Sequence, residues 1–258
     1  GGDVIDVGGV AGIFTVGGQG GAGGAGGTVN VTLDSGTRIS TEGKYSFGLL
    51  AQSIGRGGGN GGDVFTIAGR LPNAALGGDG ASDGNNGGTV EFRVEADGDG
   101  DRNRIDTQGD SAHGAVLQSI GGGGGTGGDA RSLAFGLGAL SSIAIGGEGA
   151  DGGNGGRVSV DAEALDISTT GSHARGLIAH SIGRGGGAGG SASSTDVSLG
   201  FGSAVSVGGK GGGGGDGGTL FFNLDDASIS TGGDALRDGV ANNHGIVAQS
   251  IGGGGGLG

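Results

Sequence analysis

The feature that most constrains the fold of this chain is an internal repeat that occurs four times. A phrase built on Ser-Ile and a following glycine run recurs as GLLAQSIGRGGGNGGD, GAVLQSIGGGGGTGGD, GLIAHSIGRGGGAGGS and GIVAQSIGGGGGLG. Its isoleucines, Ile54, Ile120, Ile182 and Ile251, lie 66, 62 and 69 residues apart. Such a period predicts copies of one unit that bury a shared core by stacking. We therefore divide the chain into a single repeat array of four units, 1–60, 61–126, 127–188 and 189–258.

Each unit contains β-like segments, and no window sustains a helical apolar period. In TVNVTL, Val29, Val31 and Leu33 alternate with polar residues, and TVEFRV, RVSVDA and TLFFNL occupy the equivalent positions. A period of two with one polar face is typical of a strand that covers a core. The segment that holds Ser-Ile is apolar on both faces apart from its Gln or His, which predicts burial on both sides. We expect three strands per unit and an all-β fold.

A third recurring segment, of the type DVFTIAG, leads to one aliphatic residue before a second glycine run. These aliphatic residues are Val16, Leu76, Ile145 and Val207. The following runs keep a period of three, since residues 17–27 read GGQ-GGA-GGA-GG and residues 146–156 read GGE-GAD-GGN-GG. A flexible linker has no reason to keep this phase, whereas a polyproline-II helix has three residues per turn. We expect a β-solenoid, parallel β-helix-like, in which polyglycine-II segments form part of the wall.

Two ways of stacking the units are open. If each unit is one coil, equivalent segments lie about 4.8 Å apart; the alternative gives each unit two or three coils of about 20–25 residues. The one-coil arrangement predicts three structural ladders of equivalent side chains. These ladders are Gln52, Gln118, His180 and Gln249; Ser53, Ser119, Ser181 and Ser250; and Ile54, Ile120, Ile182 and Ile251. Stacked identical side chains stabilise arrays of this kind.

Charge and composition exclude several classes of function. The net charge of −13 argues against binding of nucleic acid or anionic lipid, because both require clustered Lys and Arg. No apolar run approaches the roughly 18 residues of a membrane span, so we expect no direct membrane insertion. The absence of cysteine excludes disulfides. Because the sequence has no initiator Met and no signal-like start, we interpret it as a fragment of a longer chain.

The sequence offers no recognisable catalytic motif. No GK[ST] follows a glycine run, and no helix follows one either, so phosphate-binding and dinucleotide-binding loops are not indicated. The four histidines, His113, His173, His180 and His244, lack the spacing of metal ligands and are interpreted as structural or surface residues. We expect no catalytic residues, no cofactor-binding residues and no enzymatic activity.

Calcium is the one metal that a local pattern suggests. The insertion ADGDGDRNR places Asp97, Asp99 and Asp101 at alternate positions, and alternating carboxylates suit a cation that takes six to eight oxygen ligands. However, Arg102 occupies the place where a calcium loop turns on glycine, and Gln108 stands in place of the closing Glu. A solvated acidic hairpin tip is the alternative interpretation.

The units resemble the glycine-rich passenger repeats of bacterial autotransporters and related large surface exoprotein adhesins. The resemblance rests on TEGKYSFGLLAQSIGRGGGNGG (41–62), TQGDSAHGAVLQSIGGGGGTGG (107–128), TTGSHARGLIAHSIGRGGGAGG (169–190) and TGGDALRDGVANNHGIVAQSIGGGGG (231–256). It implies export to the bacterial cell surface and a structural or adhesive role as a stalk or filament. The implied partners are neighbouring repeats, further copies of the chain, and a host or neighbouring-cell surface. The alternatives are an ice-binding or other flat-surface recognition module and a polysaccharide-acting parallel β-helix enzyme.

Overall fold

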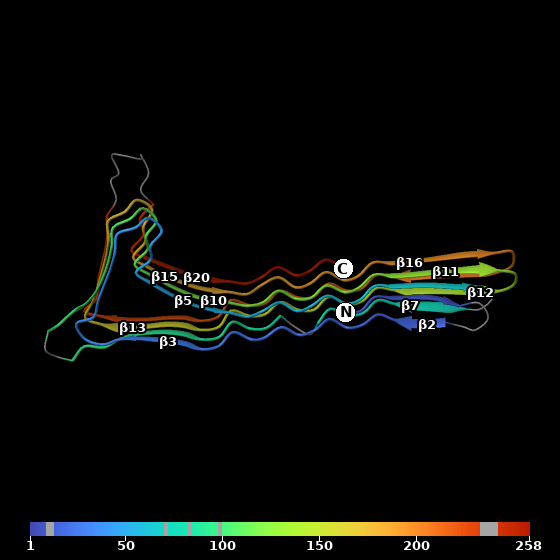
Figure 1. The fold of residues 1–258 in the computed structure, drawn as a ribbon, viewed down its shortest axis with the longest axis horizontal. Helices are drawn as coiled ribbons and strands as arrows, with labels where there is room; N and C mark the ends of the chain where they lie inside the picture. Colours follow the sequence, from blue (N-terminus) through green and yellow to red (C-terminus); the bar gives the residue numbers. More distant parts are fainter. Residues whose placement is uncertain (9–12, 70–71, 82–83, 98–99, 233–241) are drawn as a thin grey trace.

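The computed structural model of the chain describes residues 1–8, 13–69, 72–81, 84–97, 100–232 and 242–258. These residues form strands and turns and no helix, which confirms the all-β expectation. The strands pair in parallel into five sheets of four strands, and each sheet takes one strand from each sequence unit (Figure 1). Each unit is therefore one coil, and the stacked parallel strands are consistent with a β-solenoid or β-helix.

Two sheets lie at one end of the coils and form a part that we call the arm (Figure 1, right). Sheet A is composed of β1 (Val4–Gly8), β6 (Val64–Gly69), β11 (Ala130–Gly136) and β16 (Ala192–Ser198). Sheet B is composed of β2 (Ile13–Val16), β7 (Asn73–Leu76), β12 (Leu140–Ile145) and β17 (Gly202–Val207).

Three sheets surround a core at the other end and form a part that we call the head (Figure 1, left). Sheet C is composed of β3 (Val29–Leu33), β8 (Val90–Val94), β13 (Val158–Glu163) and β18 (Leu220–Asp225). Sheet D is composed of β4 (Arg38–Thr41), β9 (Asn103–Thr107), β14 (Leu165–Thr169) and β19 (Ser228–Thr231). Sheet E is composed of β5 (Leu49–Ile54), β10 (Ala115–Ile120), β15 (Leu177–Ile182) and β20 (Ile246–Ile251).

The head contains the largest apolar core. Equivalent residues of successive coils stack in rows, as in Val31, Phe92, Val160 and Phe222 of sheet C and Ile39, Ile105, Ile167 and Ile229 of sheet D. Phe92 and Ile105, in the second coil, are almost fully buried. The inward residues of sheets C, D and E belong to one cluster, so the head is the part of each coil where large side chains hold the sheets together.

Glycine runs connect the arm to the head and lie in two layers, which together form what we call the glycine wall. The first layer contains residues 17–27, 77–88, 146–156 and 208–218, of which 82–83 lie outside the described residues; the second contains residues 55–62, 121–128, 183–190 and 252–258. From one coil to the next, backbone hydrogen bonds link a segment of one layer to a segment of the other. In one series Gly78 N–H donates to Gly62 O (2.9 Å), Gly128 N–H to Gly78 O (2.7 Å) and Gly147 N–H to Gly128 O (2.9 Å). The runs are thus ordered elements rather than linkers.

The space around each glycine explains why glycine is needed. Within residues 121–128, a Cβ built on any glycine except Gly123 would meet backbone or hydroxyl atoms closer than 3.0 Å, a distance that real Cβ atoms essentially never show. At Gly123 the nearest atom is Gly185 O at 3.7 Å, and the next open position, three residues on, holds Thr126. Arg56 and Arg184, which stand in register with Gly122, show that one of the closed positions tolerates a side chain in other coils.

The glycine wall also determines how the arm packs. Gly62 N–H donates to Gly18 O at 2.8 Å. This bond joins the two layers at the end of the arm nearest the wall, where the strands of sheet A begin and those of sheet B end. The sheets therefore start close together, and their facing side chains are small: Val64, Ala75, Ala130 and Ala144 form one buried cluster. Beside this cluster, Ser142 Oγ donates to Ser132 Oγ across the two sheets at 2.8 Å.

Two local expectations need correction. Within the described residues each coil contains five strands, whereas three were expected; the two additional strands are those of sheet D and the return strand of the arm. Strands such as β4, of sequence RIST, have little apolar alternation and are held by pairing with their equivalents in other coils. Burial of the Ser-Ile strand on both sides is also only partly right: Val116 and Leu117 are buried, whereas Gln118 and Ile120 are half-buried.

Candidate functional surfaces

The residues of the three ladders lie in parallel register across the four coils. Gln52 pairs with Gln118, Gln118 with His180 and His180 with Gln249, and the Ser and Ile residues that follow pair in the same way. The amide Nε2 of Gln52 donates to Gln118 Oε1, and Gln118 Nε2 lies 3.4 Å from His180 Nδ1. These side chains therefore connect the first three coils on the outer surface of sheet E.

The serine row links three backbone segments at once. Ser119 Oγ donates to Gly88 O at 2.7 Å and accepts the N–H of Gly156 at 2.8 Å. Ser53 and Ser181 make the same pair of bonds in their coils. Gly88 lies in the same coil as Ser119, and Gly156 lies in the following coil. Each buried serine hydroxyl therefore connects the glycine run of its own coil to the glycine run of the next.

Histidines take structural positions where the structure describes their contacts. The ring of His113 stacks on Phe47 with centroids 5.1 Å apart, and its Nδ1 accepts the N–H of Arg175 at 3.1 Å. Burial and the nearby positive charge of Arg175 lower the pKa values of His113 and His180 from their usual value. Both rings are thus favoured in the neutral form in the folded chain.

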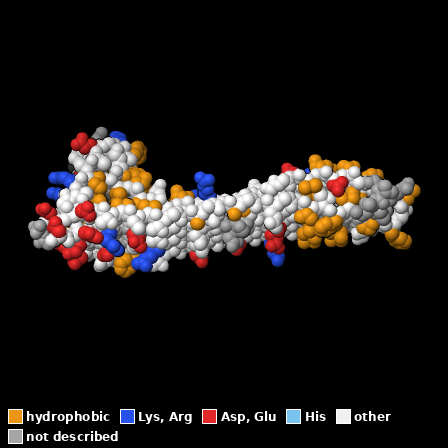
Figure 2. Space-filling view, turned by 60° about the horizontal axis from the view of Figure 1, so that its bottom comes forward, with side chains coloured by type: hydrophobic (Ala, Val, Ile, Leu, Met, Phe, Trp, Pro, Cys, Tyr) orange, Lys and Arg blue, Asp and Glu red, His pale blue; other side chains and the backbone are white. Residues whose placement is uncertain are grey.

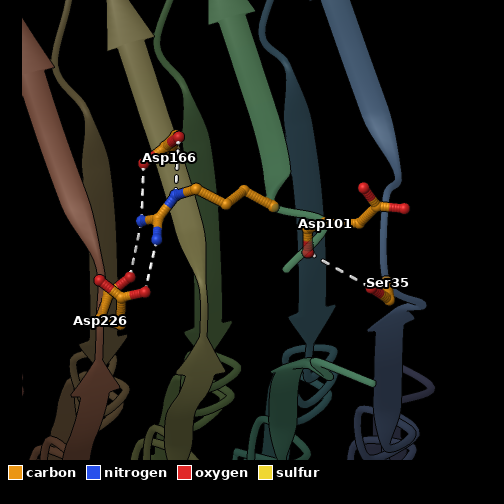
Figure 3. Close-up of polar contacts among 5 residues, drawn as sticks. Ser35, Asp101, Asp166 and Asp226 are labelled. Carbon is orange, nitrogen blue, oxygen red and sulfur yellow. Dashed lines mark hydrogen bonds and ion pairs between the residues drawn. The ribbon is translucent and has the colours of Figure 1, made fainter. Parts of the chain in front are cut away.

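The acidic insertion lies at the edge of the head, between sheets C and D. Ser35 Oγ donates to Asp97 Oδ1 at 2.9 Å. The same serine oxygen lies 3.3 Å from the main-chain oxygen of Asp101 (Figure 3). Asp99 lies outside the described residues. Within the described residues no group of three or more His, Asp or Glu is placed to hold a metal ion. Calcium binding by Asp97, Asp99 and Asp101 stays a prediction, and a melting temperature that is equal in millimolar calcium and in chelator would contradict it.

Arg102 belongs to the same insertion and connects three coils. Its Nε and Nη2 donate to the two carboxylate oxygens of Asp166 at 3.0 and 2.8 Å, and its Nη1 donates to Asp226 (Figure 3). The hydrogen bonds from Arg102 hold the pKa of Asp166 below its usual value, and the two carboxylates raise the pKa of the guanidinium further. The sequence showed that Arg102 replaces a calcium-loop glycine, but only the structure shows the acids it binds.

Side chains on the open edge of the glycine wall add further links between coils. Asn86 Oδ1 accepts the N–H of Asn154 at 2.8 Å, and Asn154 Oδ1 accepts the N–H of Asp216 at 2.7 Å. Asp79 Oδ1 likewise accepts the N–H of Glu148 at 2.9 Å. The Asn and Asp side chains of these runs therefore accept backbone hydrogen bonds from the next coil.

The arm carries the most unusual surface of the described residues. Thirteen of the 20 exposed large hydrophobic residues lie on it: Ile5, Val7, Phe14, Val16, Phe65, Phe135, Leu137, Ile145, Val197, Leu199, Phe201, Val205 and Val207. Figure 2 shows hydrophobic side chains gathered at the arm end, while acidic and basic side chains concentrate over the head. The arm thus has small side chains between its two sheets and large apolar side chains on its outer surface. Sequence reasoning noted its aliphatic residues without placing them on an outer face.

No family model, curated protein or solved structure matches the chain in the comparisons made with known proteins. In the described residues there is no helix of the length and apolar character needed to cross a membrane.

Proposed function

We propose that the chain is a structural and adhesive repeat segment of a bacterial cell-surface protein, displayed outside the cell as part of a rigid stalk or filament. The observation that carries the proposal is the stacking of four whole coils in register through five sheets and two glycine layers. Such an array gains length by adding units, and each unit interacts only with its neighbours. The resemblance to glycine-rich autotransporter passengers supports the extracellular placement.

We also propose that the glycine runs are helices of the polyglycine-II type. The support is the three-residue period of open positions, seen at Gly123 and Thr126, together with backbone hydrogen bonds to several surrounding segments. A helix with three residues per turn has three edges, each formed by every third residue. One edge carries side chains toward solvent, the second approaches the facing layer, and the third approaches the neighbouring coil. Stiffness of the stalk then comes from backbone packing as well as from the apolar core of the head.

Hydrogen exchange tests the scaffold on which the function depends. The amides of Gly121, Gly122, Gly124, Gly127 and Gly128 donate to carbonyls of neighbouring segments, so they should exchange as slowly as those of β10 and β15. Exchange at the rate of an unstructured peptide would contradict a rigid segment.

Display on bacterial cells tests the function itself. The chain is fused to a heterologous surface anchor, and adhesion to cells and to abiotic surfaces is compared with that of the anchor alone. The proposal predicts protease-resistant extensions in electron micrographs and adhesion above the anchor control. Extensions that are absent or degraded would contradict a stalk, and extensions without adhesion would leave only the structural role.

A further inference from the structure

The outer surface of sheet B forms an uncharged apolar face that extends across all four coils. Its outward residues lie in two parallel rows, Phe14, Ala74, Ile143 and Val205, and Val16, Leu76, Ile145 and Val207. The residues between them, such as Ala75 and Ala144, point inward and are completely buried. No charged side chain belongs to either row. We call this surface the apolar face.

The apolar face is larger than scattered surface hydrophobicity explains. Phe14, Val16, Ile145, Val205 and Val207 are exposed by 68, 51, 38, 45 and 51%. With roughly 150–200 Å² for a fully exposed large side chain, these five expose about 450 Å². Contiguous apolar patches beyond a few hundred Å² mark interaction sites on soluble proteins. All-parallel sheets are also normally covered on both faces, and the described residues cover sheet B only on its inner face.

We propose that a second copy of this chain covers the apolar face, its own apolar face packing against it in a two-fold symmetric pair. Two such faces would bury about 900 Å² in total, which is the size of a weak interface that forms at high concentration. Within each row neighbouring residues are about 4.8 Å apart, the strand spacing, in both copies, so side chains of one face can fit between those of the other along the whole stack. The contact area grows with every coil.

Charge favours a second copy over a lipid surface. The face borders a groove of about 380 Å³ that is also lined by Gln19, Asp79, Glu148 and Lys210, a set with a net negative charge. Attraction to anionic membranes requires clustered Lys and Arg, and the chain as a whole has a net charge of −13. In contrast, the uncharged rows let two copies of an acidic chain meet without like charges at the centre of the contact.

The inference goes beyond the proposed function, because lateral pairing and coil stacking depend on different surfaces. It is tested by sedimentation velocity of the 258-residue chain, from micromolar to millimolar concentration at fixed ionic strength. We expect a monomer–dimer equilibrium whose Kd rises at least tenfold in Ile145→Asp, since an unpaired carboxylate would be buried in the contact. The matched control is Ile54→Asp, an exposed isoleucine on sheet E at 51%, which should leave the Kd unchanged.

Three outcomes would overturn the proposal. The chain could remain monomeric at millimolar concentration, or Ile54→Asp could weaken the dimer as much as Ile145→Asp does. The chain could instead bind vesicles of phosphatidylcholine and phosphatidylglycerol in a manner that Ile145→Asp abolishes. Circular dichroism and melting temperature verify that both variants fold. Association through the edge strands of end coils would give open-ended oligomers that persist in Ile145→Asp, so it is distinguished from the face-to-face dimer.

Discussion

Replacing Gly124 by alanine tests whether glycine in the wall is required by packing. A Cβ at Gly124 would lie 2.7 Å from both the carbonyl carbon of Ala150 and the amide nitrogen of Gly187. Those two residues share a hydrogen bond of 2.8 Å between the layers, so the methyl group would be wedged into that bond. Neither backbone can move away easily, because each is also bonded to further coils.

The expected cost follows from two contributions. Overpacking in a dense interior costs about 1–3 kcal/mol, and loss of a backbone hydrogen bond adds about 0.5–1.5 kcal/mol. Alanine also restricts the unfolded chain, which stabilises by about 0.4–1 kcal/mol. The net expectation for Gly124→Ala is a loss of about 2–3 kcal/mol, which corresponds to roughly 5–10 °C in melting temperature for a chain of this size.

Gly123→Ala is the matched control for this experiment. Its Cβ would have Gly185 O as nearest atom at 3.7 Å, an ordinary contact. Because both variants restrict the unfolded chain equally, the difference between them isolates the clash. Thermal and urea unfolding followed by circular dichroism should give Gly123→Ala a stability equal to or above that of the parent chain. Equal stabilities for the two variants would refute the packing explanation of the glycine runs.

Three further predictions concern polar links between coils. Ser119→Ala removes a fully buried hydroxyl and leaves the N–H of the half-buried Gly156 without its acceptor, which should cost about 1–3 kcal/mol in urea unfolding; a cost near zero would contradict the bridging role. The folded-state pKa values of His113 and His180 are lowered, so the unfolded chain binds more protons and the free energy of unfolding should fall as pH decreases below 6.5. His180→Gln should reduce the slope of unfolding free energy against pH, and an unchanged slope would show that His180 does not contribute to it. Arg102→Met should lower the melting temperature more at low salt than at high salt, whereas a salt-independent loss would indicate a packing role.

Much of the scaffold could be predicted from the repeat and its periodicities. The spacing of Ile54, Ile120 and Ile182 defines the units, and the alternation in TVEFRV identifies an amphipathic strand. The parallel stacking follows because identical segments of successive units meet their own copies. Sheet D was missed because β4 and β9 contain Ser, Thr, Arg and Asp in place of an apolar alternation, and their stability comes from pairing between coils.

The apolar outer surface of the arm could not be predicted, because large apolar residues are expected to face the core and in the arm they face outward. In DVFTIAG the larger residues Phe65 and Ile67 alternate with Val64, Thr66 and Ala68, and large apolar residues normally face the core. In the arm the smaller set faces inward, since the glycine wall holds the two layers too close for large side chains. That spacing is a property of the whole coil and has no signal in the local sequence.

The central claim is that each unit forms one coil and that equivalent residues about 60–70 positions apart are neighbours. Because the chain contains no cysteine, engineered pairs report this directly. Ile120 and Ile182 stand in register on adjacent parallel strands, at a spacing of about 4.8 Å that a disulfide can bridge. Under mild oxidation, Ile120→Cys/Ile182→Cys should form an intramolecular disulfide, whereas the offset pair Ile120→Cys/His180→Cys should not. A disulfide in the offset pair, or none in the registered pair, would contradict the one-coil architecture.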